Sequence, residues 1–171
     1  MLFRSTMFRW GILSTANIAQ QQVVPAILRS ENGVLHGVAS RSLDSAKSFA
    51  RRFGAAKAYG SYEALLADDD IEGVYIPLPS SMHVEWTIKA AEAGKHVLCE
   101  KPIAMQAADI DRIIAVRDQT GVLISEAFMV HYHPQWHKVA ALLSSGVIGE
   151  LRYFHVSFTY YNDNASHFRN H

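Results

Sequence analysis

The chain has 171 residues, 49% of them hydrophobic and 19% charged, so it can fold into one domain with a sizeable core and part of a second. Basic and acidic side chains number 16 each, and this zero net charge indicates neither a nucleic-acid binder nor a protein of anionic membranes. A single cysteine excludes an internal disulfide, and no apolar run approaches the roughly 20 residues of a membrane span, so we expect a cytoplasmic protein.

Short apolar runs alternate with helical patterns over the first 125 residues. Strands are expected at 8–13, 34–40, 56–59, 73–76, 96–99 and 122–125. Helices are expected around 19–27, where Pro25 should kink or split the helix, and at 43–53, 61–67, 81–93 and 107–119. This alternation predicts an α/β fold, a Rossmann-type doubly wound parallel sheet covered on both faces, as a dinucleotide-binding domain over residues 1–125.

The pattern changes in residues 126–171. Residues 134–145 look helical, and Leu151 to Tyr161 alternates strictly, with Phe154, Val156, Phe158 and Tyr160 on one face. One amphipathic strand cannot bury its apolar face alone. We therefore expect 126–171 to be the incomplete, truncated start of an α+β C-terminal domain.

The first expected strand runs into a tight turn, Ser14-Thr15-Ala16-Asn17-Ile18. Phosphates bind at such a turn because the first N–H groups and the dipole of the following helix point at them. The usual fingerprint is G-x-G-x-x-G/A, and here its positions hold Ser14, Ala16 and Ala19. Because both leading glycines are replaced, the turn alone fits either a dinucleotide site or a generic strand-to-helix connection.

The second expected strand ends in Ser40 and Arg41, where a dinucleotide site distinguishes its two cofactors. An acidic residue at this point would hold the ribose diol of NAD, whereas an arginine accommodates the 2′-phosphate of NADP. The planar guanidinium of Arg41 suits a phosphate, and the Ser40 hydroxyl can donate beside it. We therefore expect NADP rather than NAD; the alternative is a solvent-facing arginine.

The buried run His96 to Cys99 ends in Glu100-Lys101-Pro102. A lysine just past a buried strand lies at the sheet edge where such folds bind ligands. There the pKa of Lys101 could fall enough for proton exchange with a substrate hydroxyl. Pro102 stiffens the backbone and is a candidate for a cis peptide bond. The alternative is an ordinary strand-to-helix loop with a surface Glu-Lys pair.

In this order, the segments RWGILSTANIA, ASR, YIPLPSSMHVEW, AGKHVLCEKPIA and SEAFMVHYHPQ resemble the Gfo/Idh/MocA family of oxidoreductases. The resemblance implies a Rossmann domain followed by an α/β domain whose open sheet mediates homo-oligomerisation. It implies that Lys101 is the catalytic lysine and that Glu100 contacts the nicotinamide side. It also implies that the cofactor is lined by Ile76, Pro77, Leu78, His83 and His131; His83 is alternatively a mere first-turn helix residue.

The resemblance predicts an NADP-dependent oxidoreductase that moves a hydride between nicotinamide and a sugar, polyol or dihydrodiol. The family carries a Gly-rich segment with an Asp and a His beyond the last residues of this chain. We therefore expect this chain to be the N-terminal half of a longer enzyme and to be inactive alone. The alternative is a non-catalytic dinucleotide-binding sensor. No metal is expected at His131, His133 and His137, because no acidic or cysteine partner joins them.

Overall fold

The computed structural model describes residues 7–159 and residue 161. The chain divides into two units, one ending at Phe128 and one beginning at Met129. The first unit contains a six-stranded sheet with its helices, and the described part of the second contains η3 and α6. None of the helices in these described residues is long and apolar enough to cross a membrane.

The six strands pair in the order β3-β2-β1-β4-β5-β6, and every neighbouring pair is parallel. Their bounds are β1 Phe8–Leu13, β2 Gly33–Ala39, β3 Lys57–Tyr59, β4 Gly73–Ile76, β5 His96–Glu100 and β6 Ile124–Ala127. The chain runs outward from β1 to β3 and then returns to the other side of β1 as β4. The strand order thus reverses between β1 and β4, which confirms the predicted doubly wound fold and marks the crevice where such sheets bind ligands.

The helices of the first unit are the π-helix η1 Ala19–Val23, α1 Val24–Arg29, α2 Leu43–Phe53, α3 Tyr62–Leu66, the 3₁₀ turn η2 Ser80–Met82, α4 His83–Glu92 and α5 Ala107–Thr120. The first helix changes from the π-helix η1 to α1 directly before Pro25 without a break, and a kink at Pro25 stays a prediction. The Ser42 hydroxyl caps α2 by accepting from the backbone N–H of Ser45, and Gly54 ends it at φ 75°. The helix expected over 81–93 is shorter, because the 3₁₀ turn η2 precedes α4 and no side chain caps α4.

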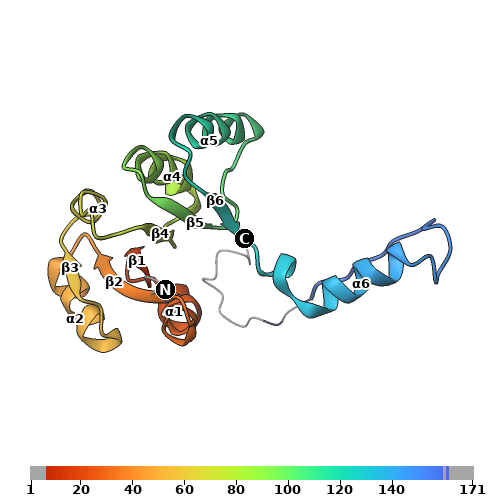
Figure 1. Cartoon of the computed structure of the whole chain (residues 1–171), viewed down its shortest axis with the longest axis horizontal. Coiled ribbons are helices and arrows are strands. Elements are labelled where there is room, and N and C mark those ends of the chain that lie inside the picture. Colours follow the sequence, from red (N-terminus) through yellow and green to blue (C-terminus); the bar gives the residue numbers. More distant parts are fainter. Residues whose placement is uncertain (1–6, 160, 162–171) are drawn as a thin grey trace, which may run out of the picture. The chain divides into compact units, whose positions relative to one another are not determined.

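The sheet is covered on both faces (Figure 1). Helices α1 and α2 pack on one face, where Ile12, Val38 and Tyr75 are fully buried. Helices α3 and α4 pack on the other face against Leu13, Val74 and other core side chains. Each fully buried aliphatic side chain contributes about 1.5–3 kcal/mol of burial free energy, so the two clusters fix the sheet and its loops.

The apolar run of β5 predicts a strand that is buried on both faces, but only one of its faces is fully buried. Val97 and Cys99 are buried under α4, but His96, Leu98 and Glu100 on the opposite face are half-buried. Burial raises the pKa of the Cys99 thiol to about 12, so this cysteine is not a nucleophile. Strand β5 therefore presents Glu100 on the less covered face, at the carboxyl edge of the sheet.

The second unit contains the 3₁₀ turn η3 Met129–Tyr132 and the helix α6 Pro134–Ser144, which confirms the predicted helix. The predicted strand over 151–161 is wrong, since residues 151–159 and 161 form no strand. Phe154, Val156 and Phe158 are 61%, 57% and 82% exposed, and Tyr160 lies outside the described residues. A strand forms only beside another, and none accompanies this segment in the described part of the second unit.

Candidate functional site

A cavity of about 290 Å³ opens at the carboxyl ends of β1, β2 and β4. This is the point where the strand order reverses. The lining residues come from the turn after β1, the end of β2, the start of α3 and the loop after β4: Ser14, Thr15, Ala16, Ser40, Arg41, Tyr62, Pro77, Leu78, Pro79 and Met82. The fold thus brings the expected phosphate turn, the expected ribose end and the Pro77-Leu78 loop into one pocket.

Ser14 occupies the first glycine position of the phosphate fingerprint, and its backbone shows why glycine is usual there. Its φ is 126°, and no other non-glycine residue in the described chain has a positive φ. Such a conformation costs about 1–3 kcal/mol for a residue with a side chain. The Ser14 hydroxyl offsets part of this cost, since it donates to the Pro77 carbonyl at 3.3 Å and accepts from the Ala16 N–H at 3.2 Å. It therefore joins the turn after β1 to the loop after β4.

Asn17 and Ile18 continue from the turn into the first helix but do not line the cavity. Both residues are exposed, Ile18 to 38%. They stand where the first N–H groups of a helix lack partners within the helix and face an anion. Their contact with a phosphate stays a prediction.

Arg41 lies two residues after the end of β2, and its side chain is exposed at the rim of the cavity. It forms no ion pair within the part of the chain that the structure describes. Ser40 is held by its backbone, whose N–H donates to the Tyr59 carbonyl at 3.1 Å, and its hydroxyl accepts from the Ser42 N–H at 3.3 Å. A fixed strand end thus carries a positive charge that is available to an anionic ligand.

Glu100 and Lys101 lie at the carboxyl end of β5, outside the lining of this cavity. The fully buried Tyr75 donates to the Glu100 carboxylate at 2.6 Å. Burial, and next this hydrogen bond, raises the pKa of Tyr75, so its phenol stays protonated and holds the carboxylate in place. Lys101 is exposed, it has no ion pair among the described residues, and its peptide bond to Pro102 is cis, as its sequence suggested.

His83 lies beneath these loops with 1% of its surface exposed. Its Nδ1 is 2.7 Å from the Pro102 carbonyl and its Nε2 is 2.7 Å from the Leu78 carbonyl. One ring therefore connects the loop after β4 with the loop that carries Lys101. It does not line the cavity, and its direct contact with a cofactor stays a prediction.

Replacing His83 by alanine should lower the free energy of unfolding by about 2–4 kcal/mol, because two carbonyls lose their partner and a buried ring leaves a void. Urea unfolding followed by tryptophan fluorescence measures this loss. Glu85→Ala, an exposed change two residues along α4, is the control and should cost about 0.5 kcal/mol or less. If the two variants were equally stable, the two contacts of His83 would contribute little.

Ile76 and His131 complete the set of residues singled out by the sequence. Ile76 is fully buried at the end of β4 and belongs to the core beneath the loop. His131 lies in η3, in the second unit, and so outside the unit that forms the cavity. The roles of both residues at a cofactor stay predictions.

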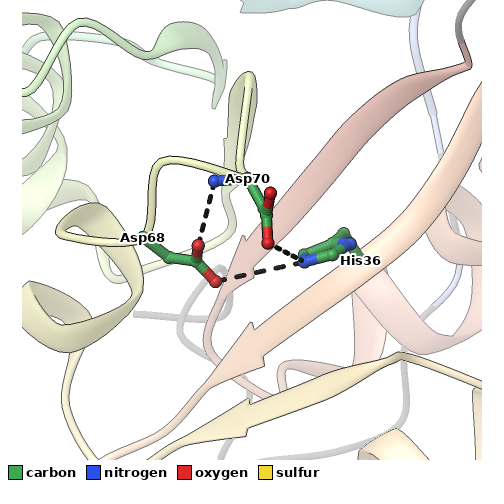
Figure 2. Close-up of side chains that lie close together, drawn as sticks. All are labelled: His36, Asp68 and Asp70. Atoms are coloured by element: carbon green, nitrogen blue, oxygen red, sulfur yellow. Dashed lines mark hydrogen bonds and ion pairs between the residues drawn. The ribbon is translucent and has the colours of Figure 1, made fainter.

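The side chains of His36, Asp68 and Asp70 lie close together, which no motif in the sequence predicts (Figure 2). His36 comes from β2 and the aspartates from the loop after α3, so no spacing in the sequence connects them. His36 Nε2 is 4.0 Å from Asp68 and 3.9 Å from Asp70. The two carboxylates already bind the ammonium of Lys57, at 2.8 Å and 2.9 Å. The Asp68 side chain is only 13% exposed, whereas that of Asp70 is 59% exposed.

The pairing of Asp68 predicts how acid destabilises the protein. The Lys57 ammonium, and next the Tyr59 hydroxyl, hold the pKa of Asp68 well below its usual range. A carboxyl with a lowered folded-state pKa stabilises the fold above its unfolded pKa of about 3.9, and this stability is lost as the pH falls through the folded value. Lys57→Gln should therefore unfold at lower urea concentration than the wild type near neutral pH, and the difference should narrow below about pH 4.

Lys47→Gln is the matched control for this urea series, because Lys47 is an exposed lysine of α2 with no ion pair in the described residues. Its difference from the wild type should be small at every pH. A Lys57→Gln difference that stayed constant from neutral to acidic pH would show that the effect does not come from the charge of Asp68.

Comparison with known proteins gives consistent matches. The family model described as "Oxidoreductase family, NAD-binding Rossmann fold" (GFO_IDH_MocA) matches residues 8–128. An uncharacterised oxidoreductase of Rhizobium meliloti is 49% identical over 156 residues, which are 91% of this chain and 47% of the relative. A D-xylose 1-dehydrogenase (NADP(+)) of Haloferax volcanii is 43% identical over 136 residues, which are 80% of this chain and 42% of the relative.

One solved structure is similar to this chain in both fold and sequence. It is a 3-ketoreductase from Actinomadura kijaniata in complex with NADP and TDP-benzene, and it matches with a TM-score of 0.79 at 42% identity. The match covers 85% of this chain and 44% of the ketoreductase. The chain therefore spans about half the length of the proteins that it matches.

Proposed function

Because this chain belongs to the Gfo/Idh/MocA oxidoreductase family, we propose that its first unit binds NADP in the cavity at the ends of β1, β2 and β4. The observation that carries the proposal is the placement of Arg41 and the Ser14 turn in one cavity at the reversal of the strand order. The turn suits the pyrophosphate and Arg41 suits a 2′-phosphate. The xylose dehydrogenase and the ketoreductase are named with NADP, which supports the same cofactor here.

The residues present fit the dinucleotide. Ser14 and Ala16 carry small side chains, so the backbone of the turn stays accessible, and the positive φ of Ser14 matches the position of a fingerprint glycine. Arg41 has no competing carboxylate in the described chain. NADP would bind along the turn and the end of β2, and it would supply the hydride-transfer chemistry.

The full-length protein would act on a sugar, polyol or dihydrodiol, a small molecule that the second domain would help to hold. Lys101 is exposed at the carboxyl edge of the sheet, so its Nζ can reach a substrate hydroxyl and exchange a proton with it. Glu100, held by Tyr75, lies one residue before it and would face the nicotinamide side. His83 keeps the loop of Lys101 against the loop after β4.

We also propose that the full-length protein self-associates through its C-terminal segment and that it is cytoplasmic. Phe154, Val156 and Phe158 are more than half exposed, so an added sheet or a second copy has apolar surface to cover. The free, buried Cys99 fits a reducing compartment. We propose neither a membrane nor a nucleic acid as a binding partner.

The proposal is tested by offering NADP and a panel of sugars, polyols and dihydrodiols to the full-length protein and following NADPH absorbance. Turnover of one substrate class, with little turnover when NAD replaces NADP, is the expected result. Binding of NADP without turnover of any substrate would favour a dinucleotide sensor and would overturn the enzymatic part.

A further inference from the structure

Tyr62 lines the cavity together with Arg41 and Ser40, although no motif in the sequence marks it. It is the first residue of α3, whose N-terminus is capped by Ser61. Its ring is buried, with 8% of the residue exposed, and packs edge-on against Trp86 of α4 with 4.9 Å between ring centroids. A tyrosine held in this way keeps its hydroxyl in one place.

The Tyr62 hydroxyl accepts and donates no hydrogen bond within the described part of the chain. Its oxygen is not among the fully buried polar atoms that lack a partner, so it stays accessible beside the cavity that Tyr62 lines, where a ligand atom can replace water. Burial raises the pKa of Tyr62, and the charge of Arg41 acts in the opposite direction. The phenol is therefore a neutral O–H donor within electrostatic range of the guanidinium.

We propose that the Tyr62 hydroxyl donates a hydrogen bond to the phosphate that Arg41 binds, so that Tyr62 is a second determinant of NADP over NAD. The proposal rests on the proposed NADP site. A phosphate oxygen accepts hydrogen bonds and attracts the guanidinium, so one anionic group can satisfy both side chains. NAD has a hydroxyl in place of that phosphate, so it would gain less from either residue.

Tyr59 provides a matched control three residues away. It is the last residue of β3, and its hydroxyl donates to Asp68 rather than to the cavity. Tyr59→Phe and Tyr62→Phe remove the same atom, and each keeps its ring. Only Tyr62→Phe should change the binding of a 2′-phosphate.

The test is a titration of full-length wild type, Tyr62→Phe and Tyr59→Phe with NADPH and with NADH, followed by calorimetry or fluorescence. Tyr62→Phe should raise the Kd for NADPH about tenfold, as expected for a hydrogen bond to a charged group, and leave the Kd for NADH within about twofold. Adenosine 2′-monophosphate should lose affinity in Tyr62→Phe, and adenosine 5′-monophosphate should not. Tyr59→Phe should match the wild type with every ligand.

Several outcomes would overturn the inference. An unchanged Kd for NADPH in Tyr62→Phe would show that the hydroxyl does not contact the phosphate. An equal loss of affinity for NADPH and NADH would show that the hydroxyl contacts a part of the cofactor that both molecules share. If wild type favours NADPH and Arg41→Ala abolishes that preference while Tyr62→Phe does not, only the role of Tyr62 fails. If wild type binds neither cofactor or favours NADH, the proposed function fails with it.

Discussion

If the full-length protein has the proposed activity, replacing Lys101 by alanine should lower its kcat by about 10²–10⁴-fold, the range typical of a general acid–base group. The Kd for NADP should hardly change, because Lys101 does not line the cavity at the ends of β1, β2 and β4. The fold should also be kept, since Lys101 is exposed and has no ion pair in the described chain. Steady-state kinetics with saturating NADP, together with a cofactor titration, separates the two effects.

Two further variants sharpen the interpretation of this loss. Lys101→Arg keeps the positive charge but cannot release a proton near neutral pH, so its kcat should stay close to that of the alanine variant. Lys47→Ala removes an exposed lysine of α2 and should keep wild-type turnover. If Lys101→Ala retained most of its activity, or if arginine restored it, proton exchange by Lys101 would be refuted.

Replacing Arg41 by alanine should weaken NADP binding by about 10–100-fold, which corresponds to the 1.5–3 kcal/mol of hydrogen bonds to a charged group. The affinity for NAD should change little, because NAD has no phosphate for the guanidinium to bind. Arg41 is exposed at the end of β2, so its truncation should not disturb the core. The measurement is a pair of Kd values, for NADP and for NAD, in each protein.

Arg51→Ala is the matched control for Arg41, since Arg51 is an exposed arginine of α2 that does not line the cavity. Both cofactors should bind this variant as they bind the wild type. Salt should weaken NADP binding more in the wild type than in Arg41→Ala, because the lost contact is ionic. An unchanged preference for NADP in Arg41→Ala would show that another group recognises the phosphate.

The sequence predicted the sheet well because alternating apolar runs and helical periods are local signals. Pro25 even marks the change from η1 to α1. The predictions were wrong where tertiary packing determines the local structure. The apolar run of β5 could not show that Leu98 faces a sparsely covered side of the sheet. The helical pattern of 81–93 could not show that its first residues would form a 3₁₀ turn.

The candidate site was predictable where its residues follow strands of the predicted sheet and unpredictable elsewhere. Ser14 and Arg41 follow consecutive strands of the predicted sheet, so their meeting at one edge could be expected. Tyr62 is the first residue of a short helix, and the His36 cluster joins β2 to the loop after α3, so neither follows a strand of the sheet or belongs to a motif. Apolar and polar residues alternate from Leu151 as in a strand, but this pattern does not show whether a second strand is present for it to pair with.

Titration of the full-length protein with NADPH and with NADH tests the central claim most directly. The claim is that the cavity between the Ser14 turn and Arg41 is an NADP site. We predict saturable binding of NADPH, at least about tenfold tighter than that of NADH, with competition by adenosine 2′-monophosphate. Failure to bind NADPH, or equal affinity for the two cofactors, would contradict the claim.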